Sequence, residues 1–201
     1  MLPIQGRLQV HLIHLRSQHY RSGVSTQGQS APLRLEGSVV ELTAQLIDIP
    51  SESHQEENLA NLVESALSAH AHLTVTRVGN SVIATNHADR GERVVIAGHL
   101  DTVPVNGNLP HHVEGQRVFG LGACDMKGGI AVALQLAAFV DTPTRDLTFI
   151  FYEAEEVATE FNGLEKIALY APEFLVADFA VLMEPSNANI DAGCQGTIRA
   201  T

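Results

Sequence analysis

The 201-residue sequence has no tryptophan, only 5% aromatic residues and just two cysteines, Cys124 and Cys194. Two cysteines are too few for a disulfide framework, and they lack the CxxC or CxxH spacing of a structural zinc site. The sequence also lacks the apolar run of about 18 residues that a membrane span needs, and its longest candidate, at 128–140, predicts a buried helix. We therefore expect a soluble protein of the reducing cytoplasm with no membrane partner.

Basic residues are also scarce, because 12 Lys and Arg stand against 23 Asp and Glu and give a formal net charge of -11. Such an acidic chain opposes binding to a polyanion, so we expect no nucleic-acid partner. The excess of carboxylates instead leaves room for bound cations. The 45% content of hydrophobic residues is that of a globular protein and excludes a disordered tail or a fibrous repeat.

Acidic residues are absent from positions 1–34, which contain four arginines, three histidines and a Ser/Gln/Gly-rich stretch at 22–30. This composition is typical of an unpacked arm, so we expect an unstructured basic leader. It lacks the apolar region and the small-residue cleavage site of a secretory signal. A transit-type or nucleic-acid-binding role, or a start codon assigned too far upstream, are the alternatives.

From Glu36 onward, helix and strand patterns alternate along the chain. Helical spacing predicts helices at 39–46, about 59–67, 127–140 and 164–169. Strand patterns lie at 73–78, 81–85, 93–97, 147–152 and 179–183. Ser53 stands where a cap of the second helix is expected, and Gly79-Asn80 is a hairpin signal between the first two strands. The order predicts an α/β fold, a mainly parallel sheet with helices on both faces.

Polar side chains follow the apolar runs of the last three predicted strands. The residues are His99-Leu100-Asp101 after the first of these strands, Glu155-Glu156 after the second and Glu184 after the third. A glycine-rich loop, 120–129, places Asp125 just ahead of a helix. Ligands of open α/β sheets bind beyond the carboxyl ends of the strands, so we expect these side chains to face one rim.

One imidazole and several carboxylates in an acidic protein form a ligand set suited to a divalent metal such as zinc or cobalt. A carboxylate can bridge two such ions about 3.5 to 4 Å apart, which predicts a co-catalytic metal centre. Alone, His99 is more simply a satisfied histidine at a strand end, and Glu155-Glu156 a solvated acidic pair. Their joint order with Asp125 and Glu184 favours the metal centre.

Three other features fit binding sites or catalysis less well. The glycine loop carries Asp125 where a dinucleotide fingerprint has its third glycine, and the chain has no GK[ST] motif of a phosphate-binding loop. Cys124 has no clear histidine partner, so we expect a neutral thiol rather than a nucleophile. His111 and His112 follow Pro110, and we expect solvated residues of a loop, with residues that line the cleft as the alternative.

Four motifs in this order resemble the signature of the dinuclear-zinc aminoacylase and carboxypeptidase family. They are GHLDTVP at 98–104, GLGACDMKGG at 120–129, Glu155-Glu156, and MEPS at 183–186. The resemblance covers about 35–201. Within the family, the segments IDIPSES, AGHLDTVPV, NGNLP and AGCQGT are most similar to succinyl-diaminopimelate desuccinylases of the actinobacterial type. The resemblance implies a three-layer αβα, zinc-exopeptidase-like catalytic domain that hydrolyses the amide of a small N-acyl amino acid.

The resemblance also assigns roles to six residues. It makes His99 and Glu184 ligands of one zinc ion, Glu156 a ligand of the second, and Asp125 the bridging carboxylate. Asp101 would accept a hydrogen bond from the ligand imidazole and fix its tautomer. Glu155 would be the general base that deprotonates the attacking water and then protonates the departing amine. The cofactor implied is two Zn²⁺ or Co²⁺ ions per complete active site.

Two parts of the family pattern lack a counterpart in the sequence: a further histidine ligand of the second zinc, and a smaller lid and dimerisation domain. We therefore expect 35–201 to be the N-terminal part of a split catalytic domain, inactive alone, with a homodimer formed only by the full-length enzyme. The alternatives are another deacylase or exopeptidase of the family, such as an acetylornithine deacetylase or a carboxypeptidase, and a non-catalytic fragment that binds metal.

Overall fold

The computed structural model describes residues 31–86, 88–187 and 189–190. Apart from 31–34, the expected leader lies outside the described residues, and so do Cys194 and the AGCQGT segment. The main helices are α1 (Val39–Ile47), α2 (Glu57–Ser68), α3 (Gly128–Phe139) and α4 (Gly163–Tyr170). Shorter helical segments are η1 (Ala123–Lys127), η2 (Thr159–Phe161) and η3 (Pro172–Leu175). Among the described residues, none of these helices has the length and apolarity to cross a membrane.

The central sheet has five strands in the order β1-β2-β6-β3-β7. They are β1 (Thr74–Val78), β2 (Ser81–Thr85), β3 (Arg93–His99), β6 (Asp146–Tyr152) and β7 (Phe179–Leu182). β3 pairs in parallel with both β6 and β7, whereas β2 pairs antiparallel with β1 and β6. Four strands therefore point the same way and β2 opposes them, which confirms the mainly parallel sheet. The turn between β1 and β2 is the expected Gly79-Asn80.

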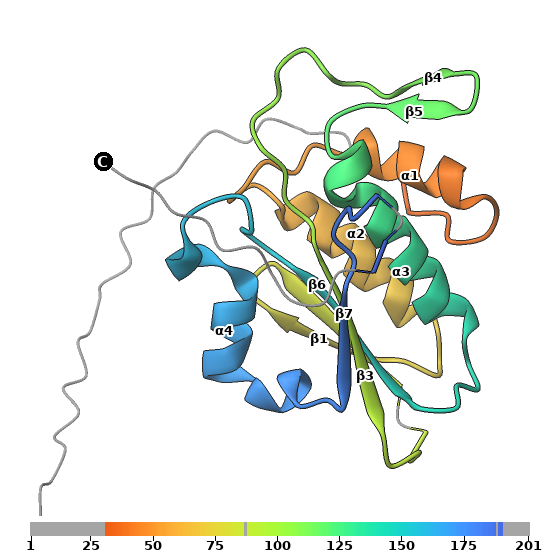
Figure 1. The fold of residues 1–201 in the computed structure, drawn as a ribbon, viewed down its shortest axis with the longest axis vertical. Helices are drawn as coiled ribbons and strands as arrows, with labels where there is room; N and C mark the ends of the chain where they lie inside the picture. The colour runs from red at the N-terminus through yellow and green to blue at the C-terminus, as the bar shows by residue number, and fades with distance from the viewer. Residues whose placement is uncertain (1–30, 87, 188, 191–201) are drawn as a thin grey trace, which may run out of the picture.

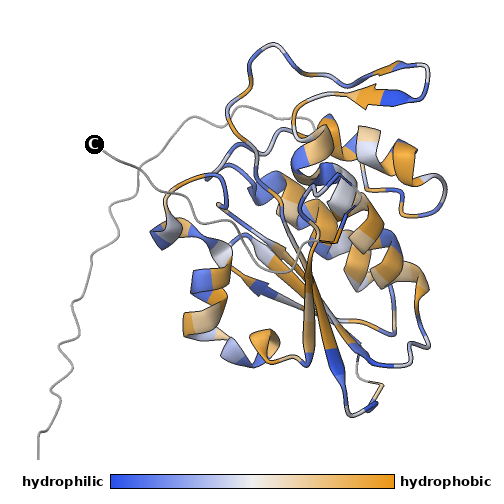
Figure 2. Ribbon diagram, in the orientation of Figure 1, coloured by the Kyte–Doolittle hydropathy of each residue, from blue (hydrophilic) through white to orange (hydrophobic). Residues whose placement is uncertain are grey.

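Helices cover both faces of the sheet, as the alternating pattern predicts. Figure 1 shows α1, α2 and α3 on one face and α4 on the other. Along β6, Phe149 and Phe151 pack in the apolar cluster with the first three helices, while Ile150 and Tyr152 pack in the cluster with α4. The two-residue alternation of a strand thus divides the core between two layers. Figure 2 shows the hydrophobic residues gathered along the strands and the inner helix surfaces.

The first helix begins where its sequence directs. Ser38 accepts a hydrogen bond from the Val40 amide, and the Glu41 carboxylate accepts one from the Ser38 amide, which forms a capping box. These bonds satisfy amides that have no partner within the helix. Leu42, Leu46 and Ile47 then bury the inner face of α1 against the core.

Two local predictions are wrong. Ser53 does not cap α2, whose N-cap residue is Glu56 and has no side-chain capping bond. Ser53 instead donates from Oγ to Asp101 Oδ2 at 2.7 Å. The segment around His111 and His112 is not simply a solvated loop, because it enters a hairpin of β4 (His112–Glu114) and β5 (Arg117–Phe119).

The hairpin is attached to α1 through a histidine. The main-chain N–H and the ring Nδ1 of His111 each lie 2.8 Å from a carboxylate oxygen of Asp48, the C-cap residue of α1. His112 remains exposed and stacks on Phe119 across the hairpin. The base of this small hairpin is therefore fixed to the main domain, next to the glycine-rich loop.

Candidate metal centre

The parallel strands bring the predicted residues to one edge of the sheet. His99 is the last residue of β3, Glu155-Glu156 follows β6 after a two-residue gap, and Glu184 lies two residues beyond β7. Because β6, β3 and β7 are parallel neighbours, their carboxyl ends lie side by side. The prediction of one shared rim is confirmed.

Asp125 reaches the same rim from the glycine-rich loop. Gly122 has a φ of +74°, which glycine adopts without strain, and the Lys127 amide donates back to the Gly122 carbonyl at 2.8 Å. Asp125 itself has φ −118° and ψ 96°, so the chain kinks there before α3 begins. The kink directs its carboxylate toward β3, and Asp125 Oδ1 lies 2.9 Å from His99 Nε2.

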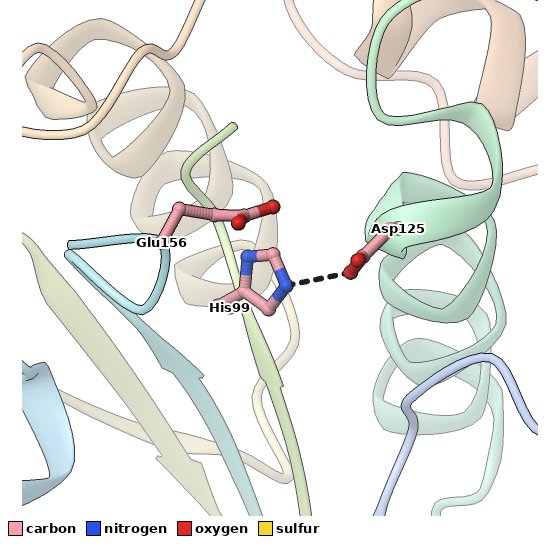
Figure 3. Close-up of side chains that lie close together, drawn as sticks. All are labelled: His99, Asp125 and Glu156. Carbon is pink, nitrogen blue, oxygen red and sulfur yellow. Dashed lines mark hydrogen bonds and ion pairs between the residues drawn. The ribbon is translucent and has the colours of Figure 1, made fainter. Parts of the chain in front are cut away.

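Three side chains form a compact group of donor atoms suited to a metal ion. One ligand atom each from His99, Asp125 and Glu156 lie within 4.8 Å of one another. Figure 3 shows the Glu156 and Asp125 carboxylates approaching the His99 imidazole from different elements. A fourth side chain is close, since Glu184 Oε1 lies 4.0 Å from His99 Nε2. The four residues predicted as metal ligands are thus brought together.

The carboxylates of this group are crowded. Burial raises the pKa of Glu156, and the charge of Asp125 raises it further. Burial likewise raises the pKa of Glu184, with smaller contributions in the same direction from Asp125, Glu155 and Glu156. A cation would remove this repulsion, and a mixed nitrogen and oxygen donor set is one that zinc and related ions accept. The residues present therefore fit a divalent metal.

His99 is buried, with 1% of its side chain exposed. Burial alone would lower its pKa, but hydrogen bonding and charge from Asp101, followed by Asp125 and Glu184, outweigh burial and raise the pKa to about 9. Its main-chain N–H lies 3.3 Å from the Met126 sulfur. The metal-free imidazole is therefore protonated at neutral pH, and a metal ion that binds to it must displace that proton.

Asp101 differs in detail from the role that the resemblance implies. His99 Nδ1 lies 3.0 Å from the main-chain oxygen of Asp101 and 3.5 Å from its carboxylate Oδ1. The carboxylate also accepts from the amides of Glu155, at 2.9 Å, and Glu156, at 3.1 Å. Burial would raise the pKa of Asp101, but these donors, the imidazole and Ser53 lower it below its ordinary value. Asp101 therefore stays ionised while fully buried.

The acidic run after β6 is divided by a turn. Glu153 is buried and pairs with Lys166 of α4 at 2.8 Å, on the side of the sheet away from α3. Ala154 then adopts a left-handed conformation, with φ +56°. Glu155 and Glu156 follow at the rim, both half-buried. Only two of the three glutamates are therefore available to the candidate site.

A cavity of about 530 Å³ adjoins the donor group. Asp125 and Glu156 belong to its lining, together with Thr102 and Val103 after β3 and the loop residues 120–124. The β4–β5 hairpin adds Val118 and Phe119. The sequence prediction missed this hairpin wall, because its strands are only three residues long. The cavity gives room for a small molecule beside the predicted metal ligands.

Lys127 is a second residue that the sequence prediction did not assign. Its side chain is almost fully buried, and Nζ donates to the Ile49 carbonyl at 2.7 Å. Burial lowers its pKa to about 8, against the opposing charge of Asp48. The available signal was a single charged residue at the start of a long apolar stretch, 126–134. The bond ties the loop of Asp125 to the segment that follows α1.

Comparison with known proteins identifies relatives of this arrangement. A family model described as Peptidase family M20/M25/M40 matches residues 95–195. A putative succinyl-diaminopimelate desuccinylase of Mycobacterium tuberculosis is 52% identical over 168 residues, covering 83% of this chain and 48% of the relative. A succinyl-diaminopimelate desuccinylase of Corynebacterium glutamicum is 46% identical over 173 residues, covering 83% and 47%.

The fold also matches a solved structure. A Bacillus subtilis protein described as a dinuclear metal-binding peptidase of the M20 family superposes with a TM-score of 0.53 at 21% identity, covering 72% of this chain and 41% of that one. At this identity the match concerns the fold alone. The chain spans about half the length of the curated relatives it matches.

Proposed function

The chain belongs to Peptidase family M20/M25/M40, and from this premise we propose that it is the metal-binding part of an amide hydrolase. The reaction is the hydrolysis of N-succinyl-LL-2,6-diaminopimelate to succinate and LL-2,6-diaminopimelate, a step of lysine and diaminopimelate biosynthesis. The family resemblance predicted from the motifs is confirmed. The observation that carries the proposal is the convergence of His99, Asp125, Glu156 and Glu184 at one sheet edge. The desuccinylase relatives at 46–52% identity support the substrate.

We propose that His99, Asp125, Glu156 and Glu184 hold the metal, with Asp125 as the bridging carboxylate of two ions. Asp125 is the most exposed of these side chains, at 53%, which suits a ligand shared between two ions on the open side of the site. Bound zinc or cobalt would supply a water of lowered pKa and polarise the amide carbonyl. Whether the native ions are zinc or cobalt is open to metal analysis of the purified protein.

Glu155 is the proposed general base. It accepts a proton from the attacking water, which forms the new C–O bond, and delivers that proton to the nitrogen as the C–N bond breaks. The Glu155 amide donates to Asp101 Oδ1, and this bond fixes the position of the Glu155 main chain beside the proposed ligand Glu156. Adjacent glutamates on one turn can then direct one carboxylate to the metal and the other to water.

We propose that the complete enzyme is longer than this chain, because the chain matches only about half the length of its relatives. Residues 35–201 would be the N-terminal part of the catalytic domain. The missing part would supply the remaining metal ligand, the lid and the contacts of a cytoplasmic homodimer. We expect the 201-residue chain alone to have little or no turnover.

Hydrolysis assays with the complete protein test the substrate. We expect N-succinyl-diaminopimelate to be cleaved with a higher kcat/KM than acetylornithine or dipeptides, and a chelator to abolish cleavage. A preference for acetylornithine or a dipeptide would assign the chain to another reaction of the family. Failure of the complete protein to bind any divalent metal would favour a non-catalytic role.

Replacement of Glu155 by alanine tests the base. We expect kcat of the complete protein to fall by about 10²- to 10⁴-fold, the usual contribution of general acid–base catalysis, while two metal ions remain bound. Metal content measured on the same preparation is the control. Loss of metal in this variant would show that Glu155 is a ligand rather than the base.

A further inference from the structure

Asp101 is a buried carboxylate with donors at both oxygens. Oδ1 accepts from the Glu155 amide at 2.9 Å, and Oδ2 accepts from the Glu156 amide at 3.1 Å. Ser53 Oγ supplies another donor, at 2.7 Å from Oδ2. Hydrogen bonds to an ionised acceptor are about twice as strong as those between neutral groups. The shortest of these three contacts is the one to Ser53.

Ser53 belongs to a segment that is held against the end of β3 by main-chain bonds. The Ser53 amide donates to the Thr102 carbonyl at 3.1 Å, and the Thr102 amide donates to the Ser51 carbonyl at 2.9 Å. Glu52 and Thr102 form a parallel bridge between these bonds. The hydroxyl of Ser53 therefore meets Asp101 from a backbone that is itself fixed.

Within the described residues, the amides of Glu155 and Glu156 both have the Asp101 carboxylate as their acceptor. Both residues are half-buried, and the preceding Ala154 adopts a left-handed conformation that an L-residue rarely takes. The orientation of the Asp101 carboxylate determines whether both amides have an acceptor. A carboxylate that rotates about its terminal bond would lose one amide or both, and the turn would lose its position.

We propose that Ser53 is a positioning residue, which holds the Asp101 carboxylate so that it fixes the Glu155–Glu156 turn in the geometry needed for metal binding and water activation. The role deepens the proposed function and rests on it for its consequence in catalysis. The contacts themselves concern the protein alone, so they are testable without metal or substrate.

The test is amide hydrogen exchange of Glu155 and Glu156, followed by NMR in the metal-free chain. Ser53→Ala removes the hydroxyl donor, and Ser53→Thr keeps it. We expect the Glu156 amide, which shares Oδ2 with Ser53, to exchange on the order of tenfold faster in Ser53→Ala, with a smaller increase at Glu155. Ser53→Thr should restore both rates.

Ser51→Ala is the matched control. Ser51 lies two residues away, and its Oγ donates to the Leu100 carbonyl at 2.8 Å rather than to the Asp101 carboxylate. Loss of the Ser51 hydroxyl should weaken the same segment. The exchange rates of the Glu155 and Glu156 amides, compared with those of amides in the β-sheet core, should stay unchanged. Equal acceleration in Ser51→Ala and Ser53→Ala, or none in Ser53→Ala, would overturn the proposal.

Metal binding gives a second readout. Loss of a side chain that orients a ligand typically costs 10- to 100-fold in metal affinity, and we expect Ser53→Ala to lower Co²⁺ affinity by about tenfold, with Ser53→Thr and Ser51→Ala near the unmodified chain. Asp101→Asn, which retains size but cannot accept from both amides, should accelerate exchange at both glutamates. If the complete protein bound no Co²⁺ while the exchange pattern held, the proposed function would fail and the positioning role would stand.

Discussion

The two faces of the sheet are buried to different degrees. On the face of α1, α2 and α3, the apolar cluster is continuous and most of its members are below a few per cent exposed. On the face of α4 the buried cluster is smaller, and large apolar side chains nearby are open to solvent. They are Leu169, Tyr170, Val176 and Leu182, each at least half exposed.

The residues of the candidate metal centre also differ in burial. His99 and Asp101 are buried at the end of the interior strand β3, whereas Glu184 follows β7, an edge strand whose residues are mostly exposed. Packing restrains side-chain orientation most where the surroundings are dense. We infer that the imidazole side of the site is set by the core, while the Glu184 side depends more on what binds there.

The strongest test of the comparison is a large-to-small substitution on the well-packed face. Phe149 of β6 is 1% exposed, and Phe149→Ala removes a ring from the centre of the larger cluster. We expect the free energy of unfolding to fall by about 3–5 kcal/mol, from lost burial and the cavity left behind. Urea denaturation followed by circular dichroism measures it, and a loss below 1 kcal/mol would contradict the packing difference.

His99→Ala addresses the buried side of the site. We expect Co²⁺ or Zn²⁺ affinity, measured by calorimetry, to fall by more than about a hundredfold, because the direct loss of a ligand exceeds the effect of an outer-shell change. Glu184→Ala should cost less, since its side chain is 40% exposed and less restrained. A larger loss in Glu184→Ala than in His99→Ala would reverse the inferred order.

The pH dependence of metal affinity sharpens the same point. The pKa of His99 is raised to about 9, so the metal-free imidazole carries a proton below that pH and metal must displace it. Apparent affinity should therefore rise by about tenfold per pH unit between pH 7 and 8, and level off above pH 9. Titrations in buffers of matched ionic strength measure the slope. Affinity that is constant over this range would show that His99 is not a ligand.

The smallest effect is expected at the exposed edge strand β7. Phe179 of β7 is 64% exposed, and Phe179→Ala should change the free energy of unfolding of this chain by no more than about 0.5 kcal/mol. It is the matched control for Phe149→Ala, as both replace phenylalanine by alanine on strands that pair with β3. A cost comparable with that of Phe149→Ala would mean that burial in the larger cluster does not set the cost of losing a phenylalanine ring.

Periodicity and strand-end chemistry predicted most of the architecture. The runs ending at His99, Glu155-Glu156 and Glu184 were recognisable because each apolar strand stops abruptly at polar residues, and a parallel sheet must bring such ends together. The helix over 127–140 was recognisable from its length and apolar content. These signals are local, but a parallel sheet leaves few ways to arrange the strand ends, so they also predicted which residues lie together.

Contacts made across the chain were beyond this kind of prediction. Serine is a residue type that commonly caps helices, so the local sequence suggested a cap at Ser53. The bridge between Glu52 and Thr102 instead brings Ser53 to Asp101, 48 residues away. The β4–β5 hairpin is held by His111 and Asp48, 63 residues apart, and its strands are too short to show an alternation. In both cases tertiary partners override the local pattern.

The left-handed Ala154 has a consequence for how the site would fail. An L-residue held in this conformation costs about 1–2 kcal/mol, which the surrounding bonds must offset. If the acceptors at Asp101 were lost, relaxation of Ala154 to an ordinary backbone angle would release that strain and turn both glutamates away together. Loss of the Asp101 carboxylate would therefore displace both glutamates, whereas loss of the Ser53 hydroxyl weakens mainly the bond to the Glu156 amide.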